Sequence, residues 1–265
     1  MKRDAKLKRI QQISLDILKE IIRVCDENNI DYQLCRGSLL GAIRHKGIIP
    51  WDDDIDISMK RKDFDRFLEI APSKLPMEME VLSYKSEKVY PFVFAKVFNK
   101  NTSVVEHYLE SSGYRSGVYV DIFPIDGTPN NRILRRLHIG KVSFYENALT
   151  LSYLDENRHK EWWKRLLIKV GKKVINKEKT HKKVQNLLRK YDLEKSELVT
   201  IMGRRRSELL MPKWIFETRM VDFEGMKVKG TKEFDLYLSK LYGDYMKIPD
   251  VENQIQHMSY MDFNI

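Results

Sequence analysis

The hydrophobic pattern of the chain changes its period several times. Hydrophobic side chains recur every three or four positions over residues 4–27, 60–71 and 232–242, which predicts amphipathic helices. Alternating segments and short apolar runs predict strands at residues 30–34, 54–57, 79–84, 92–98 and 119–124 and on both sides of Glu224-Gly225. From residue 132 to residue 191 the pattern is again helical.

This order of elements predicts an α+β fold, with a mixed β-sheet core flanked by helices and a mainly helical, basic C-terminal half. A chain of 265 residues is long for one domain, although no repeat or Gly/Ser linker marks a boundary. We expect a core at 1–130 and a basic helical segment at 131–200. Elements at 201–265 are expected to pack back on the core and shape the substrate site.

The most unusual polar pattern is a run of four aspartates within residues 52–56. Carboxylates this close repel one another, and a divalent cation such as Mg²⁺ or Mn²⁺ would remove the repulsion. In a strand, Asp54 and Asp56 share one face, and Ile55 and Ile57 point to the other. The two carboxylates can therefore ligate one metal ion or flank two. A calcium loop of the EF-hand type is a poor alternative because its glycine and distal glutamate are missing.

A candidate phosphate turn precedes these aspartates. Gly37 and Ser38 follow a predicted strand and open a short apolar helix, with Ser38 expected near the N-cap. Backbone amides at the start of a helix favour an anion, although an ordinary capped turn is the simpler explanation for these two residues alone. Arg44, His45 and Lys46 follow and add three candidate cationic donors.

Two charged residues interrupt predicted strands further along the chain. Asp121 lies on the face opposite its apolar neighbours, and aspartate is disfavoured in strands. A cation shared with Asp54 and Asp56 would explain it, and the alternative is the solvated end of an edge strand. Lys96 lies inside an apolar run, where a charge is costly unless it is paired. It is either an edge residue that reaches solvent or the partner of a phosphate or carboxylate.

Composition narrows the class of protein. The hydrophobic content of 42% is enough for a core, and the net charge of +10 indicates an anionic partner such as a nucleotide, a nucleic acid or a membrane surface. Cys25 and Cys35 form neither a metal pair nor a disulfide framework, which favours the reduced cytoplasm. The basic N-terminus lacks the apolar stretch of a signal peptide, and we expect any membrane contact to be peripheral, at the inner face.

The positive charge is concentrated between residues 158 and 190. That segment holds thirteen Lys or Arg and two Glu, so the rest of the chain is close to neutral. Trp162 and Trp163 add an apolar side. The segment could lie against an anionic membrane or bind nucleic acid. The simpler alternative is a solvated helical face whose Trp pair packs inside.

The sequence from Arg36 to Asp56 closely resembles that of the LicD family, which includes the fukutin-type transferases. The order of its motifs also resembles that of the nucleotidyltransferase superfamily. The resemblance continues through residues 96–99, 120–126, 223–225 and 237–245. It implies a nucleotidyltransferase-like core. It also implies an enzyme that transfers a phospho-alcohol, typically phosphocholine from CDP-choline, to a sugar hydroxyl, with release of CMP. The acceptor would be a glycan or lipid-linked sugar of a teichoic-acid or lipopolysaccharide precursor.

The resemblance also implies roles for individual residues. Asp54 and Asp56 would be metal ligands, and Asp121 would be a third ligand or the base. The residues expected to bind the donor or stabilise its charge are Gly37, Ser38, Arg44, His45, Lys46 and Lys96. Two alternatives remain: a nucleotidyltransferase that moves the nucleotide itself, and a non-catalytic basic module that binds membrane or nucleic acid. The intact set of aspartates argues against the second, and nucleic acid is not the expected partner.

Overall fold

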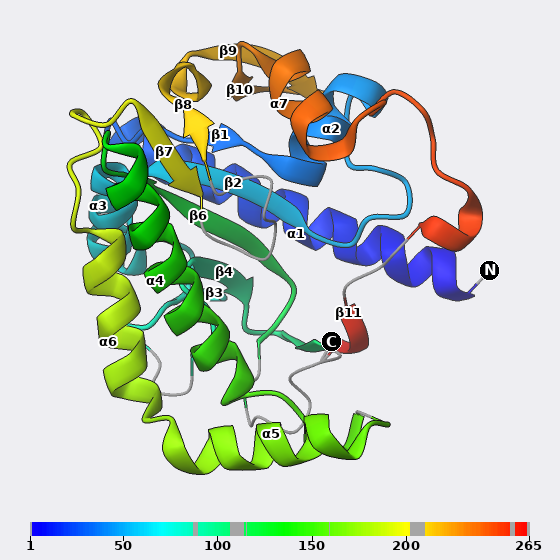
Figure 1. The fold of residues 1–265 in the computed structure, drawn as a ribbon. Helices are drawn as coiled ribbons and strands as arrows, with labels where there is room; N and C mark the ends of the chain where they lie inside the picture. Colours follow the sequence, from blue (N-terminus) through cyan, green and yellow to red (C-terminus); the bar gives the residue numbers. More distant parts are fainter. Residues whose placement is uncertain are drawn as a thin grey trace.

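The computed structural model describes residues 2–86, 90–106, 114, 116–158, 160–201, 210–254 and 258–263. Its centre is a nine-stranded mixed sheet with helices on both sides (Figure 1). The strands of this sheet are β1 (Gln33–Leu34), β2 (Ile55–Lys60), β3 (Met79–Leu82), β4 (Ala95–Asn99), β6 (Tyr119–Gly127), β7 (Leu198–Ile201), β8 (Met211–Pro212), β9 (Thr218–Phe223) and β10 (Met226–Thr231). The expected α+β architecture is confirmed.

The strand order places the acidic segments at the middle of the sheet. The main path runs β3-β4-β6-β2-β1-β10-β9, and β7 extends from β6 to β8. Strands β2 and β6 are parallel neighbours, whereas β4 is antiparallel to β6. Every residue of β6 is buried, so Asp121 does not lie on an edge strand.

Two helices form the layer behind the sheet in Figure 1. Helix α1 (Lys2–Glu27) contacts β2, β4 and β6, and α3 (Arg61–Lys74) contacts β2, β3 and β6. The apolar side chains of Ile55 and Ile57, on the face opposite Asp56, are fully buried in the main core. Burial of this face fixes the register of β2, because a shift of one residue would turn its aspartates into the core.

The basic segment forms a second helical layer with its own small core. Its helices are α4 (Arg132–Leu151), α5 (Trp162–Val174) and α6 (Lys177–Leu188). Asn131 starts α4 by accepting hydrogen bonds from the backbone N–H groups of Ile133 and Leu134. The buried residues of this second core are Leu82, Tyr90, Phe92, Val93, Tyr114, Val142, Leu149, Tyr153, Val184 and Leu188. The layer therefore packs on the edge of the sheet formed by β3 and the segment before β4.

The Trp pair does not pack inside. Trp162 is 74% exposed and Trp163 is 52% exposed, so the alternative of a solvated helical face with the Trp pair packed inside is wrong for α5. Only Ile168 and Gly171 of this helix are buried. No helix of the described residues is both long enough and apolar enough to cross a membrane.

The C-terminal third returns to the same sheet. Strands β9 and β10 form a hairpin in which Glu224 and Gly225 both have positive φ. Strand β10 pairs with β1 in parallel, and α7 (Phe234–Tyr242) follows it. Separately, β11 (Met258–Phe263) pairs with β5 (Thr102–Glu106). Residues far apart in the sequence thus surround the acidic strand β2.

Candidate active site

Three carboxylates from two strands converge at the centre of the sheet. Asp56 and Asp121 are register partners in the parallel pair of β2 and β6, and Asp54 lies on the same side just before β2. Each of the three offers an oxygen atom within 4.8 Å of the others. Oxygen ligands at this spacing fit Mg²⁺ or Mn²⁺, because hard divalent cations bind carboxylates.

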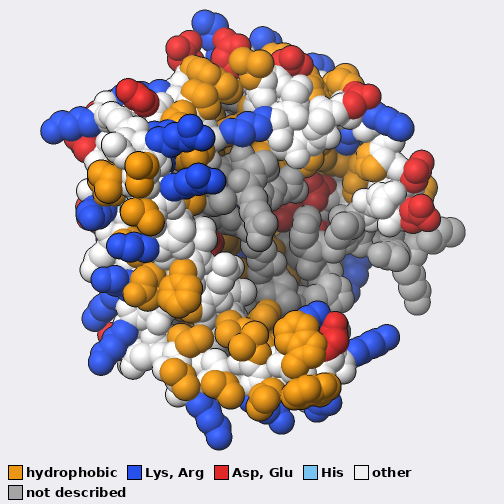
Figure 2. All heavy atoms as spheres, viewed as in Figure 1, with side chains coloured by type: hydrophobic (Ala, Val, Ile, Leu, Met, Phe, Trp, Pro, Cys, Tyr) orange, Lys and Arg blue, Asp and Glu red, His pale blue; other side chains and the backbone are white. Residues whose placement is uncertain are grey.

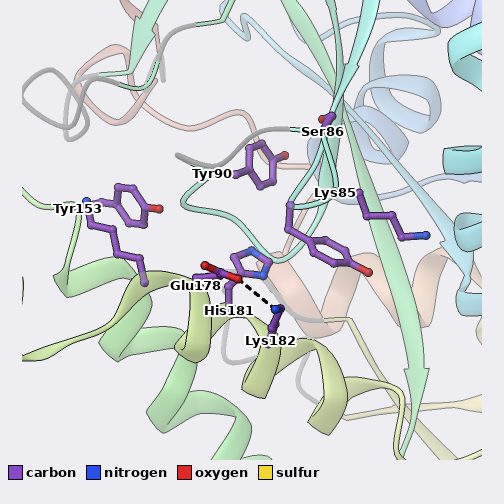
Figure 3. Close-up of a pocket in the computed structure, with 9 residues that line it drawn as sticks. Lys85, Ser86, Tyr90, Tyr153, Glu178, His181 and Lys182 are labelled. Atoms are coloured by element: carbon purple, nitrogen blue, oxygen red, sulfur yellow. Dashed lines mark hydrogen bonds and ion pairs between the residues drawn. The ribbon is translucent and has the colours of Figure 1, made fainter.

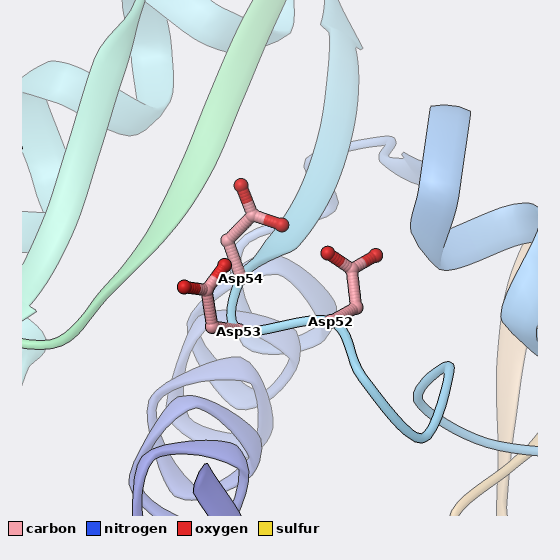
Figure 4. A group of neighbouring side chains, drawn as sticks. All are labelled: Asp52, Asp53 and Asp54. Atoms are coloured by element: carbon pink, nitrogen blue, oxygen red, sulfur yellow. The ribbon is translucent and has the colours of Figure 1, made fainter. Parts of the chain in front are cut away.

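A second acidic group overlaps the first. Asp52, Asp53 and Asp54 lie on the loop that enters β2 (Figure 4), and their oxygen atoms also lie within 4.8 Å of one another. Asp54 belongs to both groups, and Asp53 is only 2% exposed. Burial raises the cost of mutual repulsion, so this cluster favours a compensating cation.

The start of α2 (Arg36–His45) is bonded directly to the strand that carries the aspartates. The backbone N–H of Asp56 donates to Ser38 Oγ over 2.7 Å, and the N–H of Cys35 donates to the carbonyl oxygen of Asp56. Cys35 is the N-cap residue and makes no side-chain capping bond. Ser38 lies near the N-cap, as expected, but it does not cap the helix: it is in the first turn, and its hydroxyl accepts from β2.

Gly37 lies close to the acidic loop, and a side chain here would force the Asp52 carboxylate to move. A Cβ atom at this position would lie 2.9 Å from Asp52 Oδ2. The amide groups of the first helical turn lack partners within the helix and carry the positive end of its dipole. The structure thus brings Gly37 and Ser38 to the same place as the carboxylates.

Lys96 is buried against the third carboxylate. Lys96 and Asp121 are register partners between β4 and β6, and Lys96 Nζ lies 2.7 Å from Asp121 Oδ1. Lys96 is 1% exposed, and its Nζ lies 3.3 Å from the centroid of the Tyr119 ring. This burial excludes the alternative that Lys96 is an edge residue whose side chain reaches solvent. The lysine offsets one of the negative charges and holds Asp121 in place.

Arg36 is a candidate that the sequence reasoning missed. Its guanidinium carbon lies 3.7 Å from the centroid of Phe123, which is two residues beyond Asp121 and on the same face of β6. Its backbone N–H donates to Tyr237 Oη over 3.2 Å. Arg36 has φ of 49°, a conformation that few non-glycine residues adopt. The only signal in the sequence was its position directly before Gly37.

The predicted cationic group at 44–46 lies at the other end of α2. Arg44 donates to the carbonyl oxygens of Tyr245 and Lys247, and its Nε donates to His45 Nε2 over 2.9 Å. The carbonyl oxygen of Lys46 accepts from the N–H of Glu224. Burial and the charge of Arg44 lower the pKa of His45. Arg44 and Lys46 thus connect the end of α2 to the C-terminal third of the chain, at the opposite end of the helix from Gly37 and Ser38.

Comparison with known proteins points to one family. The model of the LicD/FKTN/FKRP nucleotidyltransferase domain matches residues 29–150. The chain is 29% identical to the lipopolysaccharide cholinephosphotransferase LicD of Haemophilus influenzae over 264 residues, which cover 95% of each protein. It is also 29% identical over 161 residues to an uncharacterised protein of Rickettsia typhi, covering 57% of this chain and 47% of the relative.

The matched range contains every acidic residue of the site described above. It begins before β1 and ends within α4, so it includes both strands that carry the carboxylates and the helix that is bonded to them. The resemblance stated from residues 36–56 is confirmed. The protein carries a nucleotidyltransferase domain of the LicD family at residues 29–150.

Proposed function

We propose that the protein is a metal-dependent phosphotransferase. It transfers phosphocholine, or a similar phospho-alcohol, from a CDP-activated donor to a sugar hydroxyl of a lipopolysaccharide or related cell-surface glycan precursor. The observation that carries the proposal is the convergence of Asp54, Asp56 and Asp121 beside the start of α2. The likeness to LicD of Haemophilus influenzae, named a cholinephosphotransferase, supports the choice of phospho-alcohol.

In this proposal Asp54, Asp56 and Asp121 hold the metal ion. A bound Mg²⁺ or Mn²⁺ would offset the charge of the donor diphosphate and of the departing CMP. Asp121 remains tied to Lys96, which keeps its carboxylate oriented. The donor phosphates lie against the amide groups of Gly37 and Ser38, where the helix dipole favours an anion.

The reaction exchanges one phosphorus–oxygen bond for another. The acceptor hydroxyl oxygen attacks the phosphorus that bears choline, the bond from that phosphorus to CMP breaks, and CMP leaves with the electron pair. The hydroxyl proton passes to a carboxylate of the site. Lys96 Nζ lies 2.7 Å from Asp121 Oδ1, so this carboxylate is held in place whether it acts as a metal ligand or as the base.

A screen of CDP-alcohols with Mg²⁺ tests the proposal. We expect CMP release from CDP-choline with a glycan acceptor, and loss of release in Asp56→Asn. Asp222→Asn is the matched control because Asp222 is an exposed aspartate on β9, paired with Lys227. Full CMP release by Asp56→Asn would reject the assigned site. Pyrophosphate release from a nucleoside triphosphate, without CMP release, would instead identify a nucleotidyltransferase.

We further propose that α5 places the enzyme on an anionic membrane at the inner face, near a lipid-linked acceptor. The exposed apolar side chains of α5 are Trp162, Trp163, Leu166, Leu167, Val170 and Val174. At 100° per residue they all fall on one side of the helix. Figure 2 shows hydrophobic side chains gathered where α5 runs, with Lys and Arg beside them. Amphipathic helices that lie in the membrane interface have this pattern.

Charge favours a membrane over a second copy of the chain on this surface. Two copies facing each other through α5 would bring together two segments rich in Lys and Arg, which repel. Anionic lipid head groups attract the same residues. Membrane binding would keep the acceptor sugar near the carboxylate site during synthesis of the glycan.

A further inference from the structure

A cavity of about 490 Å³ lies outside the carboxylate site, between the segment that follows β3 and helix α6 (Figure 3). Its volume is in the range of small-molecule sites. Tyr153 and His181 point toward a common space, Tyr90 also lines it, and the exposed lysines Lys85 and Lys182 complete the lining. The lining is thus aromatic inside and cationic outside.

The aromatic part is preorganised. The rings of Tyr84 and His181 stack with centroids 5.1 Å apart and planes 20° apart. Tyr90 and Tyr153 are almost fully buried. The negative face of an aromatic ring attracts polarised hydrogens, and a sugar ring presents several C–H bonds on one face. Flat, rigid side chains therefore suit a sugar ring better than a flexible aliphatic chain.

His181 specifies a hydrogen-bond donor on the ligand. Its Nε2 lies 2.7 Å from the carbonyl oxygen of Phe92, and a carbonyl can only accept, so Nε2 carries the proton. Nδ1 is consequently an acceptor. This side chain is 7% exposed, and Nδ1 is buried without a hydrogen-bond partner among the described residues. A buried unpaired acceptor is costly, and a sugar hydroxyl would satisfy it.

Lys177 favours a ligand that carries an anionic group. Its Nζ lies 4.0 Å from the centroid of Tyr153, and no carboxylate in the described part of the chain lies within ion-pair distance. The side chain is half-buried, and burial together with Lys172 lowers its pKa. Glu178 pairs with Lys182 over 3.0 Å, so among the described residues Lys177 and Lys85 are the lining cations without a carboxylate partner. A phosphate or carboxylate group would pair with Lys177.

The sheet register places the end of β3, beside this cavity, three strands away from Asp56. Leu82, at the end of β3, is the register partner of Lys96, which is the partner of Asp121. Register partners point to the same face, and three strand spacings of about 4.8 Å separate Leu82 from Asp56. Tyr84 follows Leu82 by two residues. The cavity is therefore too far away to hold the transferred group, but an extended ligand could reach both sites.

We propose that this cavity binds a phosphorylated sugar, with the ring against Tyr84, a hydroxyl on His181 Nδ1 and the anionic group on Lys177. If the proposed function holds, the ligand is an anionic sugar unit of the glycan acceptor, bound a few units from the hydroxyl that reacts. The binding itself does not depend on that function.

Calorimetric titration with glucose 6-phosphate tests the site, with glucose and inorganic phosphate as separate arms. The titration uses the full chain carrying Asp56→Asn, so catalysis plays no part. We expect the sugar phosphate to bind more tightly than either part alone. Lys177→Gln should weaken its binding by about tenfold or more, as expected for loss of a charge-assisted bond. Lys173→Gln, an exposed lysine on α5, is the control and should bind normally.

A second variant tests the ring contact. Tyr84→Leu removes the stacked face and should weaken both glucose 6-phosphate and glucose, whereas Lys177→Gln should weaken only the ligands with phosphate. Equal binding by Lys177→Gln and the parent, or equal affinity for inorganic phosphate and the sugar phosphate, would overturn the proposal. Absence of binding would also overturn it. Binding of glucose 6-phosphate without CMP release from any CDP-alcohol would keep this site and reject the proposed function.

Discussion

The carboxylate site and helix α5 both concentrate charge of one sign, yet they hold it in opposite ways. At the site, negative groups lie at the middle of the sheet, fixed by the register of β2 and β6 and offset by the buried Lys96. On α5, positive groups surround apolar side chains that no other described element covers. Buried charge of this kind implies a bound counter-ion, whereas an exposed apolar face with basic edges implies a partner surface.

The largest effect is expected from a change at the carboxylates. Asp54→Asn should reduce CMP release on the order of 10³-fold, because a metal ligand is lost. The free energy of unfolding without metal should stay the same or rise slightly, because repulsion with Asp53 and Asp56 is relieved. Steady-state kinetics and thermal unfolding in EDTA measure the two quantities. A variant that unfolds would instead show that these aspartates are structural.

Lys96→Met tests whether the charges of the site are balanced. It leaves Asp121 buried without its cation, and loss of one partner of a buried pair costs about 3–5 kcal/mol. Urea unfolding should show this loss in the variant. The double variant Lys96→Met/Asp121→Asn should recover part of it. If the single variant is as stable as the parent, Lys96 does not offset the site.

The exposed apolar face of α5 is tested by replacing both of its tryptophans. Trp162→Ser together with Trp163→Ser should weaken binding to phosphatidylglycerol vesicles by at least about tenfold, because two large apolar side chains no longer enter the interface. Co-sedimentation at low and high salt measures the effect. Met77→Ser removes an exposed apolar side chain elsewhere and is the control. If the parent protein does not sediment with vesicles at low salt, the membrane proposal is wrong.

A smaller effect is expected where α2 meets the acidic strand. Ser38→Ala removes the acceptor for the N–H of Asp56 and should cost about 1 kcal/mol of stability. The shift of Asp56 should also raise the KM for the CDP-alcohol. Ser73→Ala is the matched control, because that hydroxyl bonds only within its own exposed helix end. Equal KM values for the two variants would show that the hydrogen bond between α2 and Asp56 does not affect donor binding.

The smallest effect concerns pH. Burial lowers the pKa of His181, so the unfolded chain binds its proton at a higher pH than the folded chain does. Stability from this group is therefore present above the unfolded pKa of about 6.5 and is lost as pH falls through the folded value. Melting temperatures measured across this range should fall with pH. The fall should be shallower in His181→Gln, and an identical slope would show that other groups cause it.

Strand parity explains why most of the site could be predicted. Asp54 and Asp56 are two residues apart, and the isoleucines beside them had to be buried, so their common face followed from the sequence. The parallel pairing with β6 did not follow, because it depends on the whole order of the strands. Asp121 was inferred from its poor fit to a strand, and Lys96 from the cost of burying its charge.

Other features depend on contacts that the local pattern does not encode. Ser38 looked like a capping residue because the sequence does not show that the N–H of Asp56 would need its hydroxyl. The exposure of Trp162 was undetermined, because an amphipathic helix does not reveal which side faces the protein. The pairing of β5 with β11 joins segments more than a hundred residues apart, and neither segment carries a clear alternation.

The two-residue strand β1 has a consequence for how the chain is made. It lies between β2 and β10, so its outer edge is filled by a strand that begins at Met226. During translation, the segment with all three carboxylates leaves the ribosome long before β10 is available. The nascent chain therefore carries an unpaired strand edge beside its acidic loop until residues 226–231 have emerged, and ribosomes stalled before that point would hold a sheet that is open next to the site.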